Sequence, residues 1–244
     1  MSDFKYYRPN NLPPIVKNLI IINVLVYVAQ LIFKSQHLTE TLSLYPIMPQ
    51  GLHDFLVQQG IYSASEKFYP YQIATHLFAH SPDTIFHIVF NMFTLWMFGR
   101  ILENVWGPKR FLLYYILCGI GAAACHLIVQ YFRCEQLWNL IQEGNMQQAV
   151  KMIGAASPAL GASGAIMGVI VAFGYLFPNT ELYIMFIPIP VKAKWAVLGF
   201  AAIDLFGGVA QINGDNIAHF AHLGGAITGF ILVLIWSHNR KRFY

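Results

Sequence analysis

Six apolar runs divide the chain, and polar or charged positions separate them. The runs cover residues 16–33, 85–102, 111–131, 159–177, 193–208 and 217–236. A helix that crosses a membrane needs about 20 mainly apolar residues, so the fourth and fifth runs are short for this purpose. The pattern predicts an all-α polytopic membrane protein with six transmembrane helices.

Two long loops lie between these runs. Residues 34–84 are rich in aromatic residues and proline, and the third loop carries an amphipathic stretch at 135–150. Neither loop contains an apolar run long enough to cross a membrane, so we expect interfacial helices in both. Residues 1–244 are interpreted as one membrane domain with a core of about 16–236 and no separate soluble domain.

The composition agrees with a lipid environment. Hydrophobic residues make up 57% of the chain and charged residues 11%, and the mean hydropathy is +0.51. Soluble domains carry about 25% charged residues. The net charge of +4 lies mainly in short flanks, and the sequence shows no basic face with interleaved aromatic residues, so we expect no nucleic-acid partner.

The sequence gives no indication of a metal or cofactor. Its 3 cysteines lack the CxxC spacing of metal sites. His76 and His80 are about one helical turn apart, but the stretch HLFAH lacks the glutamate of the HExxH zinc motif. We therefore expect these two histidines to brace the first loop, and we expect no cofactor.

The distribution of Lys and Arg predicts the orientation in the membrane. Most of them lie in the N-terminal flank, in the turns at 107–110 and 192–194, and in the C-terminal flank, whereas the first loop is net acidic. By the positive-inside rule both termini are cytoplasmic, and the second, fourth and sixth runs begin at the outer face. Without an organelle presequence or a large soluble extension, we expect the bacterial inner membrane.

Three polar residues fall at one depth on these three runs. By the helical rise per residue, Asn91, Ser163 and His222 lie roughly 5 to 10 Å below the outer surface. Polar side chains inside a membrane are costly and by default mark a function. A serine becomes a nucleophile when a base removes its proton, and neutral histidine is the usual base. A lone membrane serine would be a packing residue, but the three together predict a catalytic Ser163 with His222 as its base.

Attack by a serine creates an oxyanion, which requires hydrogen-bond donors. The backbone N–H of Ser163 lies in the unpaired first turn of its predicted helix and is one such donor. His87 and Asn91 are four residues apart, so their side chains share one helix face and can add further donors.

Glycines accompany both catalytic candidates at the spacing of helix contacts. Small residues four apart let two helix backbones approach closely, so we expect the fourth and sixth helices to pack against each other and to bring Ser163 within reach of His222. The predicted packing glycines are Gly161, Gly164, Gly168, Gly225 and Gly229.

Four motifs carry a resemblance to a known family. They are HIVFN at 87–91, ENVWG at 103–107, GASGAIMG at 161–168 and AHLGGAITG at 221–229. In this order and spacing they resemble the rhomboid intramembrane serine proteases, in particular the bacterial six-helix type, over about residues 16–236.

The resemblance implies roles, a reaction and partners. Ser163 would be the nucleophile and His222 the base of a dyad that needs no acid. Asn91 and His87 would donate to the oxyanion. The implied substrates are single-span membrane proteins in the lipid bilayer, cleaved near the outer end of their helix in an active site that opens to the periplasmic side. The sequence predicts no oligomeric state.

His219 and Asp204 are alternatives for the acid–base chemistry. His219 lies about one turn before His222 and could be the base by position alone. Because Gly225 and Gly229 lie on the same helix face as His222, we take His222 as the base and interpret His219 as an interfacial residue nearer water. Asp204 could be the acid of a Ser-His-Asp triad. The family that the chain resembles needs no such acid, so we expect Asp204 to be an interfacial or hydrogen-bonded carboxylate.

The chain departs from the family at two places. Tyr71 and Gln72 stand where many bacterial relatives carry a Trp-Arg pair, and Met167 stands where some members place a tyrosine against the histidine ring. The alternative function is a catalytically inactive rhomboid-like membrane adaptor, which is disfavoured because such members usually lack the serine or the histidine. A small transporter would predict inverted repeats, and the sequence shows none.

Overall fold

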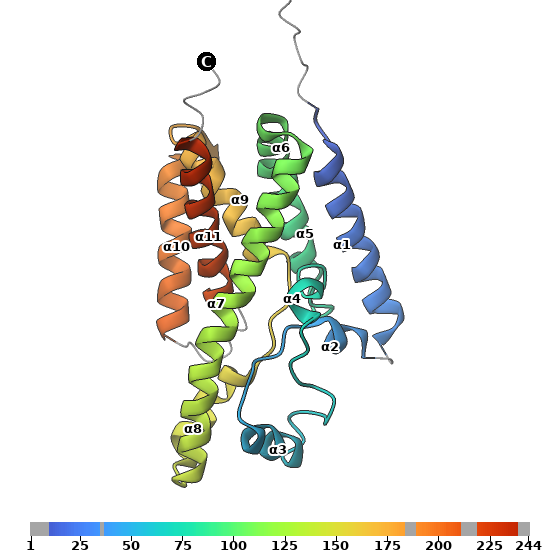
Figure 1. Cartoon of the computed structure of the whole chain (residues 1–244), viewed down its shortest axis with the longest axis vertical. Helices are drawn as coiled ribbons and strands as arrows, with labels where there is room; N and C mark the ends of the chain where they lie inside the picture. Colours follow the sequence, from blue (N-terminus) through green and yellow to red (C-terminus); the bar gives the residue numbers. More distant parts are fainter. Residues whose placement is uncertain (1–9, 35–36, 184–188, 211–218, 239–244) are drawn as a thin grey trace, which may run out of the picture.

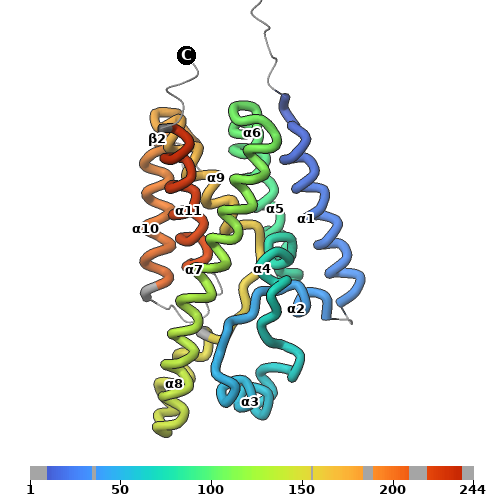
Figure 2. The backbone as a smooth tube through the Cα atoms, in the orientation of Figure 1, coloured from blue at the N-terminus to red at the C-terminus, as the bar shows by residue number. Residues whose placement is uncertain are grey.

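A bundle of roughly parallel and antiparallel helices makes up most of the computed structural model, which describes residues 10–34, 37–183, 189–210 and 219–238. Shorter helices gather toward the end of the bundle that is lower in Figures 1 and 2. The bundle consists of α1 (Pro14–Ile32), α5 (Ile85–Thr94) continued by η2 (Leu95–Gly99) and α6 (Arg100–Trp106), α7 (Pro108–Gln142), α9 (Ser163–Leu176), α10 (Ala193–Ala210) and α11 (His219–His238). The shorter helices are α2 (Leu38–Leu42), α3 (Gln50–Gln58), α4 (Gln72–Thr75), α8 (Met146–Met152) and η3 (Ile153–Ala156).

Four helical segments among the described residues are long and apolar enough to cross a membrane. They are Pro14–Ile32, Ile85–Trp106, Pro108–Gln142 and His219–Ser237, and Ser163–Leu176 is a shorter apolar helix. Large apolar side chains also cover the outside of the bundle, which suits lipid and not water; examples are Leu25, Ile32, Phe86 and Phe206. The chain is therefore a mostly helical, multi-pass membrane protein.

The expectation of an all-α fold is wrong in one place. Two short antiparallel strands, β1 (Glu181–Tyr183) and β2 (Pro190–Lys192), pair between α9 and α10, with Glu181 opposite Lys192. Ala193 N donates to Thr180 O (2.8 Å) and closes the base of this hairpin. Strands of three residues are too short to give an alternating pattern in the sequence.

Helix α7 extends well beyond the predicted apolar run at 111–131. Its 35 residues span about 50 Å, whereas the hydrocarbon core of a membrane is about 30 Å thick. Residues 135–142, which we expected in an interfacial helix, are the end of α7. Their apolar face packs against other parts of the chain instead of a membrane surface, in a second core formed by Leu52, Leu56, Cys134, Leu137, Ala149 and Ala156.

Glu103, the first residue of the motif at 103–107, has a structural role. Its buried carboxylate on α6 accepts hydrogen bonds from Ile15 N (2.9 Å) and Val16 N (2.8 Å) in the first turn of α1. The first amides of a helix have no partner within the helix, and the positive end of its dipole favours an anion. Glu103 therefore caps α1 from a neighbouring helix and joins the two.

Helix α9 occupies the centre of the bundle. Every residue from Gly164 to Gly174 is buried, and the helix packs against α7, α10 and α11. A helix that is apolar on all sides is stable only when other apolar groups surround it. The first residue of this central helix is Ser163.

Candidate catalytic site

Ser163 and His222 are in direct contact. Ser163 opens α9, His222 lies in the first turn of α11, and the distance between Ser163 Oγ and His222 Nε2 is 2.8 Å. Both side chains are partly buried. This distance is that of a hydrogen bond through which the hydroxyl proton can pass to the ring.

Backbone contact between α9 and α11 sets the position of these two residues. A Cβ at Gly225 would overlap Gly164 O, and a Cβ at Gly229 would lie 2.7 Å from Gly168 Cα. A Cβ at Gly168 would also lie 3.1 Å from Gly225 O. The four glycines therefore allow an approach that any side chain would prevent.

Gly161 is not the helix-packing glycine that we predicted, because it lies before α9 begins and shapes the turn that leads into Ser163. Its φ of +126° is unfavourable for residues with a side chain, and its N–H donates to His76 O (2.9 Å). A Cβ at this position would lie 2.9 Å from His87 Nε2 and 3.5 Å from Ser163 Oγ. The glycine thus leaves open the space where the His87 ring faces the serine.

The hydrogen bond to His87 Nδ1 defines the protonation of its ring. Ser81 N donates to this nitrogen (3.2 Å), and a ring nitrogen that accepts a hydrogen bond carries no proton. The proton of the neutral ring is therefore on Nε2, the nitrogen near Gly161. One turn further along α5, buried Asn91 donates from Nδ2 to His87 O (3.0 Å), and the second hydrogen of this amide is available for another acceptor.

Asp204 joins the site from α10. Its Oδ1 lies 2.9 Å from His222 Nδ1. Because a carboxylate only accepts, the His222 proton lies on Nδ1 and leaves the lone pair of Nε2 toward Ser163. The carboxylate is hydrogen-bonded, which was one of the two favoured alternatives, but its partner is the histidine beside Ser163, so the three side chains have the Ser-His-Asp arrangement that we disfavoured from the sequence. The sequence placed Asp204 near the outer end of its helix, and thus near the level of His222, but this position alone does not distinguish a histidine partner from lipid headgroups.

His219 is buried, and the expectation that it lies at the interface nearer water is wrong. Its Nδ1 lies 2.9 Å from the same Asp204 Oδ1, and its side chain is 9% exposed. A Cβ at Gly207 would overlap His219 Nε2, so this nitrogen faces α10. Asp204 Oδ1 therefore accepts hydrogen bonds from both His219 and His222.

Gln72 fastens the first loop at the position where we noted the departure from the Trp-Arg pair. Its buried Oε1 accepts from Tyr45 N (3.2 Å) and Tyr69 N (3.1 Å), and its Nε2 donates to Lys67 O (3.2 Å). An amide group with both a donor and an acceptor thus connects three separate points of this loop.

His76 and His80 in the first loop are buried and neutral. His76 Nδ1 donates to Gln72 O (2.8 Å), and burial lowers the pKa of His76. Burial and the nearby His87 lower the pKa of His80 to about 4. Within the described ranges, no three His, Cys, Asp or Glu side chains come together as metal ligands.

Comparison with known proteins gives one family match and several relatives. A family model described as the rhomboid domain matches residues 67–239. Rhomboid protein 1, mitochondrial, from Saccharomyces cerevisiae is 28% identical over 153 residues, which cover 63% of this chain and 38% of that protein. The presenilin-associated rhomboid-like protein, mitochondrial, from Bos taurus is 30% identical over 162 residues, which cover 64% and 37%.

A plant relative aligns over more of the chain. RHOMBOID-like protein 12, mitochondrial, from Arabidopsis thaliana is 26% identical over 227 residues, 93% of this chain and 59% of that protein. These three relatives are all named mitochondrial, so they do not support the specifically bacterial type that we expected. This chain spans less than two thirds of the length of each. Because the rhomboid domain matches more than half of the chain, this protein belongs to the rhomboid family.

Proposed function

We propose that this protein is an intramembrane serine endopeptidase that cleaves the membrane-embedded segments of single-span proteins. The observation that carries this proposal is the 2.8 Å contact between Ser163 Oγ and His222 Nε2. A serine with a neutral histidine at this distance has the base that it needs to become a nucleophile.

Acylation begins with proton transfer from Ser163 Oγ to His222 Nε2. Oγ bonds to the carbonyl carbon of the scissile peptide, whose oxygen takes up the negative charge. The backbone N–H of Ser163, His87 Nε2–H and the free Asn91 N–H are the donors proposed for this oxyanion. When the intermediate collapses, the C–N bond breaks, and the leaving amine takes the proton from His222.

Deacylation repeats these steps with water as the nucleophile. His222 Nε2 accepts a proton from water, the hydroxyl oxygen bonds to the acyl carbon, and the ester bond to Ser163 Oγ breaks as this oxygen regains the proton. In both halves the hydrogen bond from His222 Nδ1 to Asp204 Oδ1 keeps the ring in the tautomer that leaves Nε2 free. The negative charge of Asp204 also stabilises the imidazolium form.

The membrane arrangement is part of the same proposal. The four long apolar segments, together with the apolar α9 and α10, make six crossings. Ser163, His87 and His222 all lie near the first residues of their helices. The charge bias of the loops supports placing these helix ends, and hence the site, on the side opposite the termini.

The alternative is a rhomboid-like adaptor that binds transmembrane segments without cutting them. A labelling experiment separates the two functions. The purified protein is incubated with a fluorophosphonate probe, and the modified residue is mapped by mass spectrometry. A peptidase gives a covalent adduct on Ser163 and cleaves a labelled single-span substrate in detergent, and Ser163→Ala gives neither. An unlabelled serine with an intact substrate would support the adaptor.

A further inference from the structure

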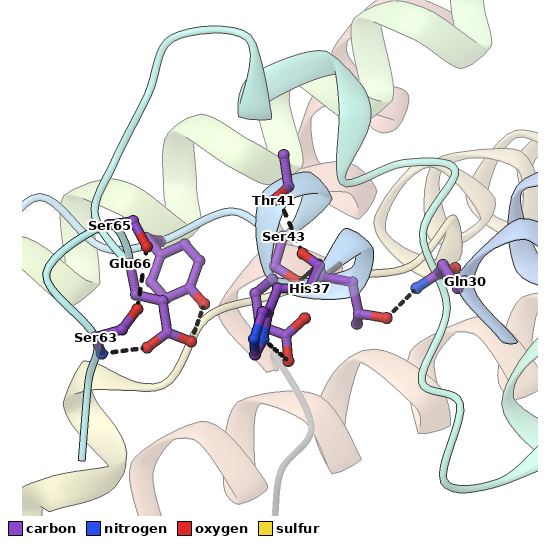
Figure 3. Close-up of polar contacts among 10 residues, drawn as sticks. Gln30, His37, Thr41, Ser43, Ser63, Ser65 and Glu66 are labelled. Carbon is purple, nitrogen blue, oxygen red and sulfur yellow. Dashed lines mark hydrogen bonds and ion pairs between the residues drawn. The ribbon is translucent and has the colours of Figure 1, made fainter. Parts of the chain in front are cut away.

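Gln30, in the last turn of α1, is fully buried and holds one peptide segment of the first loop. Its Oε1 accepts from His80 N (3.0 Å), and its Nε2 donates to His80 O (3.0 Å). Figure 3 shows the Gln30 amide reaching toward α2, where Nε2 also donates to Thr39 Oγ1 (3.0 Å). Both backbone groups of His80 are thus paired by a single side chain, as a neighbouring strand would pair them.

The held segment continues directly into the His87 contact. Ser81, the next residue, supplies the N–H that donates to His87 Nδ1 (3.2 Å). The His80 ring also packs edge-on against the His87 ring, with 5.1 Å between centroids. The position of the 80–81 backbone therefore determines both the tautomer and the orientation of His87.

We propose that Gln30 is a positioning residue for the oxyanion site, which acts through the backbone of His80 and Ser81 to hold the His87 Nε2–H toward Ser163. This inference rests on the proposed function, in which His87 is an oxyanion donor. Loss of the Gln30 amide leaves a buried N–H and C=O of His80 without these partners. The loop segment then shifts, and His87 moves with it.

A matched control lies on the same helix. Asn23 is a second fully buried amide of α1, and its Nδ2 donates to Leu19 O (2.8 Å) within the helix. Its Oδ1 has no hydrogen-bond partner among the described residues. Asn23→Leu therefore tests the loss of a buried α1 amide that has no connection to the first loop, and Gln30→Met tests the loss of Gln30 with its length preserved.

The kinetic test compares these variants in detergent with a fluorogenic transmembrane substrate. Gln30→Met should lower kcat about 10-fold to 100-fold, the cost of a displacement of about 1 Å at a reacting group, with KM within about twofold of the wild type. Asn23→Leu should retain the wild-type kcat. In the His87→Ala background, Gln30→Met should cause no further loss, because residues that act as one unit are not additive. A full additional loss in the double variant would overturn the proposal.

A second measurement does not depend on protease activity. In ¹⁵N imidazole spectra of the detergent-solubilised protein, His87 should show the Nε2–H tautomer in the wild type and in Asn23→Leu, and a mixture of tautomers in Gln30→Met. An unchanged His87 tautomer in Gln30→Met would overturn the proposal. If Gln30→Met changes the tautomer but the wild-type protein cleaves nothing, the proposed peptidase function fails while the positioning of His87 by Gln30 stands.

Discussion

Gly225 on α11 lies against the backbone carbonyl of Gly164 on α9, so that no side chain fits between them. Gly164 directly follows Ser163, and Gly225 is three residues beyond His222. The distance between the serine and the histidine therefore depends on two helix backbones in contact. Packed backbone atoms can shift less than flexible side chains to accommodate an added group.

Gly225→Ala should lower both activity and stability, because the added methyl group meets a backbone atom. We expect a loss of about 1–3 kcal/mol in the free energy of unfolding and a fall in kcat of about 100-fold, since the two helices separate at the site. Gly199→Ala is the control, because a Cβ there has nothing within 4 Å. Thermal unfolding and cleavage assays on both variants check this, and equal activity of the two would contradict it.

Ser163→Ala and His222→Ala should each abolish cleavage, and the double variant should be no worse than either single variant. The thermal unfolding temperature in detergent should stay close to that of the wild type, because both side chains are partly exposed. Progress curves with a single-span substrate measure the residual activity. An inactive His219→Ala combined with an active His222→Ala would show that the base has been misassigned.

Asp204→Asn should lower kcat by about 100-fold or more with little change in KM, since an amide can donate to His222 Nδ1 and favour the wrong tautomer. The control is Asp54→Asn. Asp54 lies on α3, away from the site, and its carboxylate accepts a hydrogen bond from Gln50 on the same helix. Steady-state kinetics on the two variants test this prediction. A wild-type kcat for Asp204→Asn would show that His222 works without this carboxylate.

Stability should fall as the pH decreases from about 6.5 toward 4. The unfolded chain binds a proton at His80 near the ordinary pKa of 6.5, whereas the folded protein binds it near 4. Between these values the unfolded state holds more protons, so the free energy of unfolding decreases with decreasing pH. His76, whose pKa is also lowered, acts in the same direction.

This pH dependence should become weaker in His80→Gln. Thermal unfolding in detergent at pH 7.5, 6 and 5 measures the slope, with exposed His37→Gln as the control variant. An identical slope in His80→Gln and the wild type would mean that His80 is protonated in the folded protein over the same range as in the unfolded chain.

The sequence placed Ser163 and His222 at one level because membrane helices have a regular rise and glycines mark their contact faces. The contacts of Asp204 and Gln30 were harder to predict. A carboxylate near a helix end has the same sequence pattern whether it meets lipid headgroups or a histidine. Gln30 contacts a loop fifty residues away, and no periodicity describes the path of that loop.

The contacts made by the end of α7 could not be predicted for a different reason. Its amphipathic pattern correctly indicated one apolar face, but the pattern does not say what covers this face. Contacts with α3 and α8 replace the membrane surface that we expected. The β1–β2 hairpin was missed because its strands are only three residues long.

The shortness of α9 has a consequence for water. Its 14 residues measure about 21 Å, against about 30 Å of hydrocarbon. If its last turn reaches one face of the membrane, Ser163 stops about 9 Å short of the other. Ser163, the proposed nucleophile, then lies below the headgroups, and the missing turns leave room for an aqueous recess above it. Inserting about six residues into α9 after Ser163 would move the serine about 9 Å to the surface, where the hydrolytic water is abundant but a membrane-embedded peptide bond is out of reach.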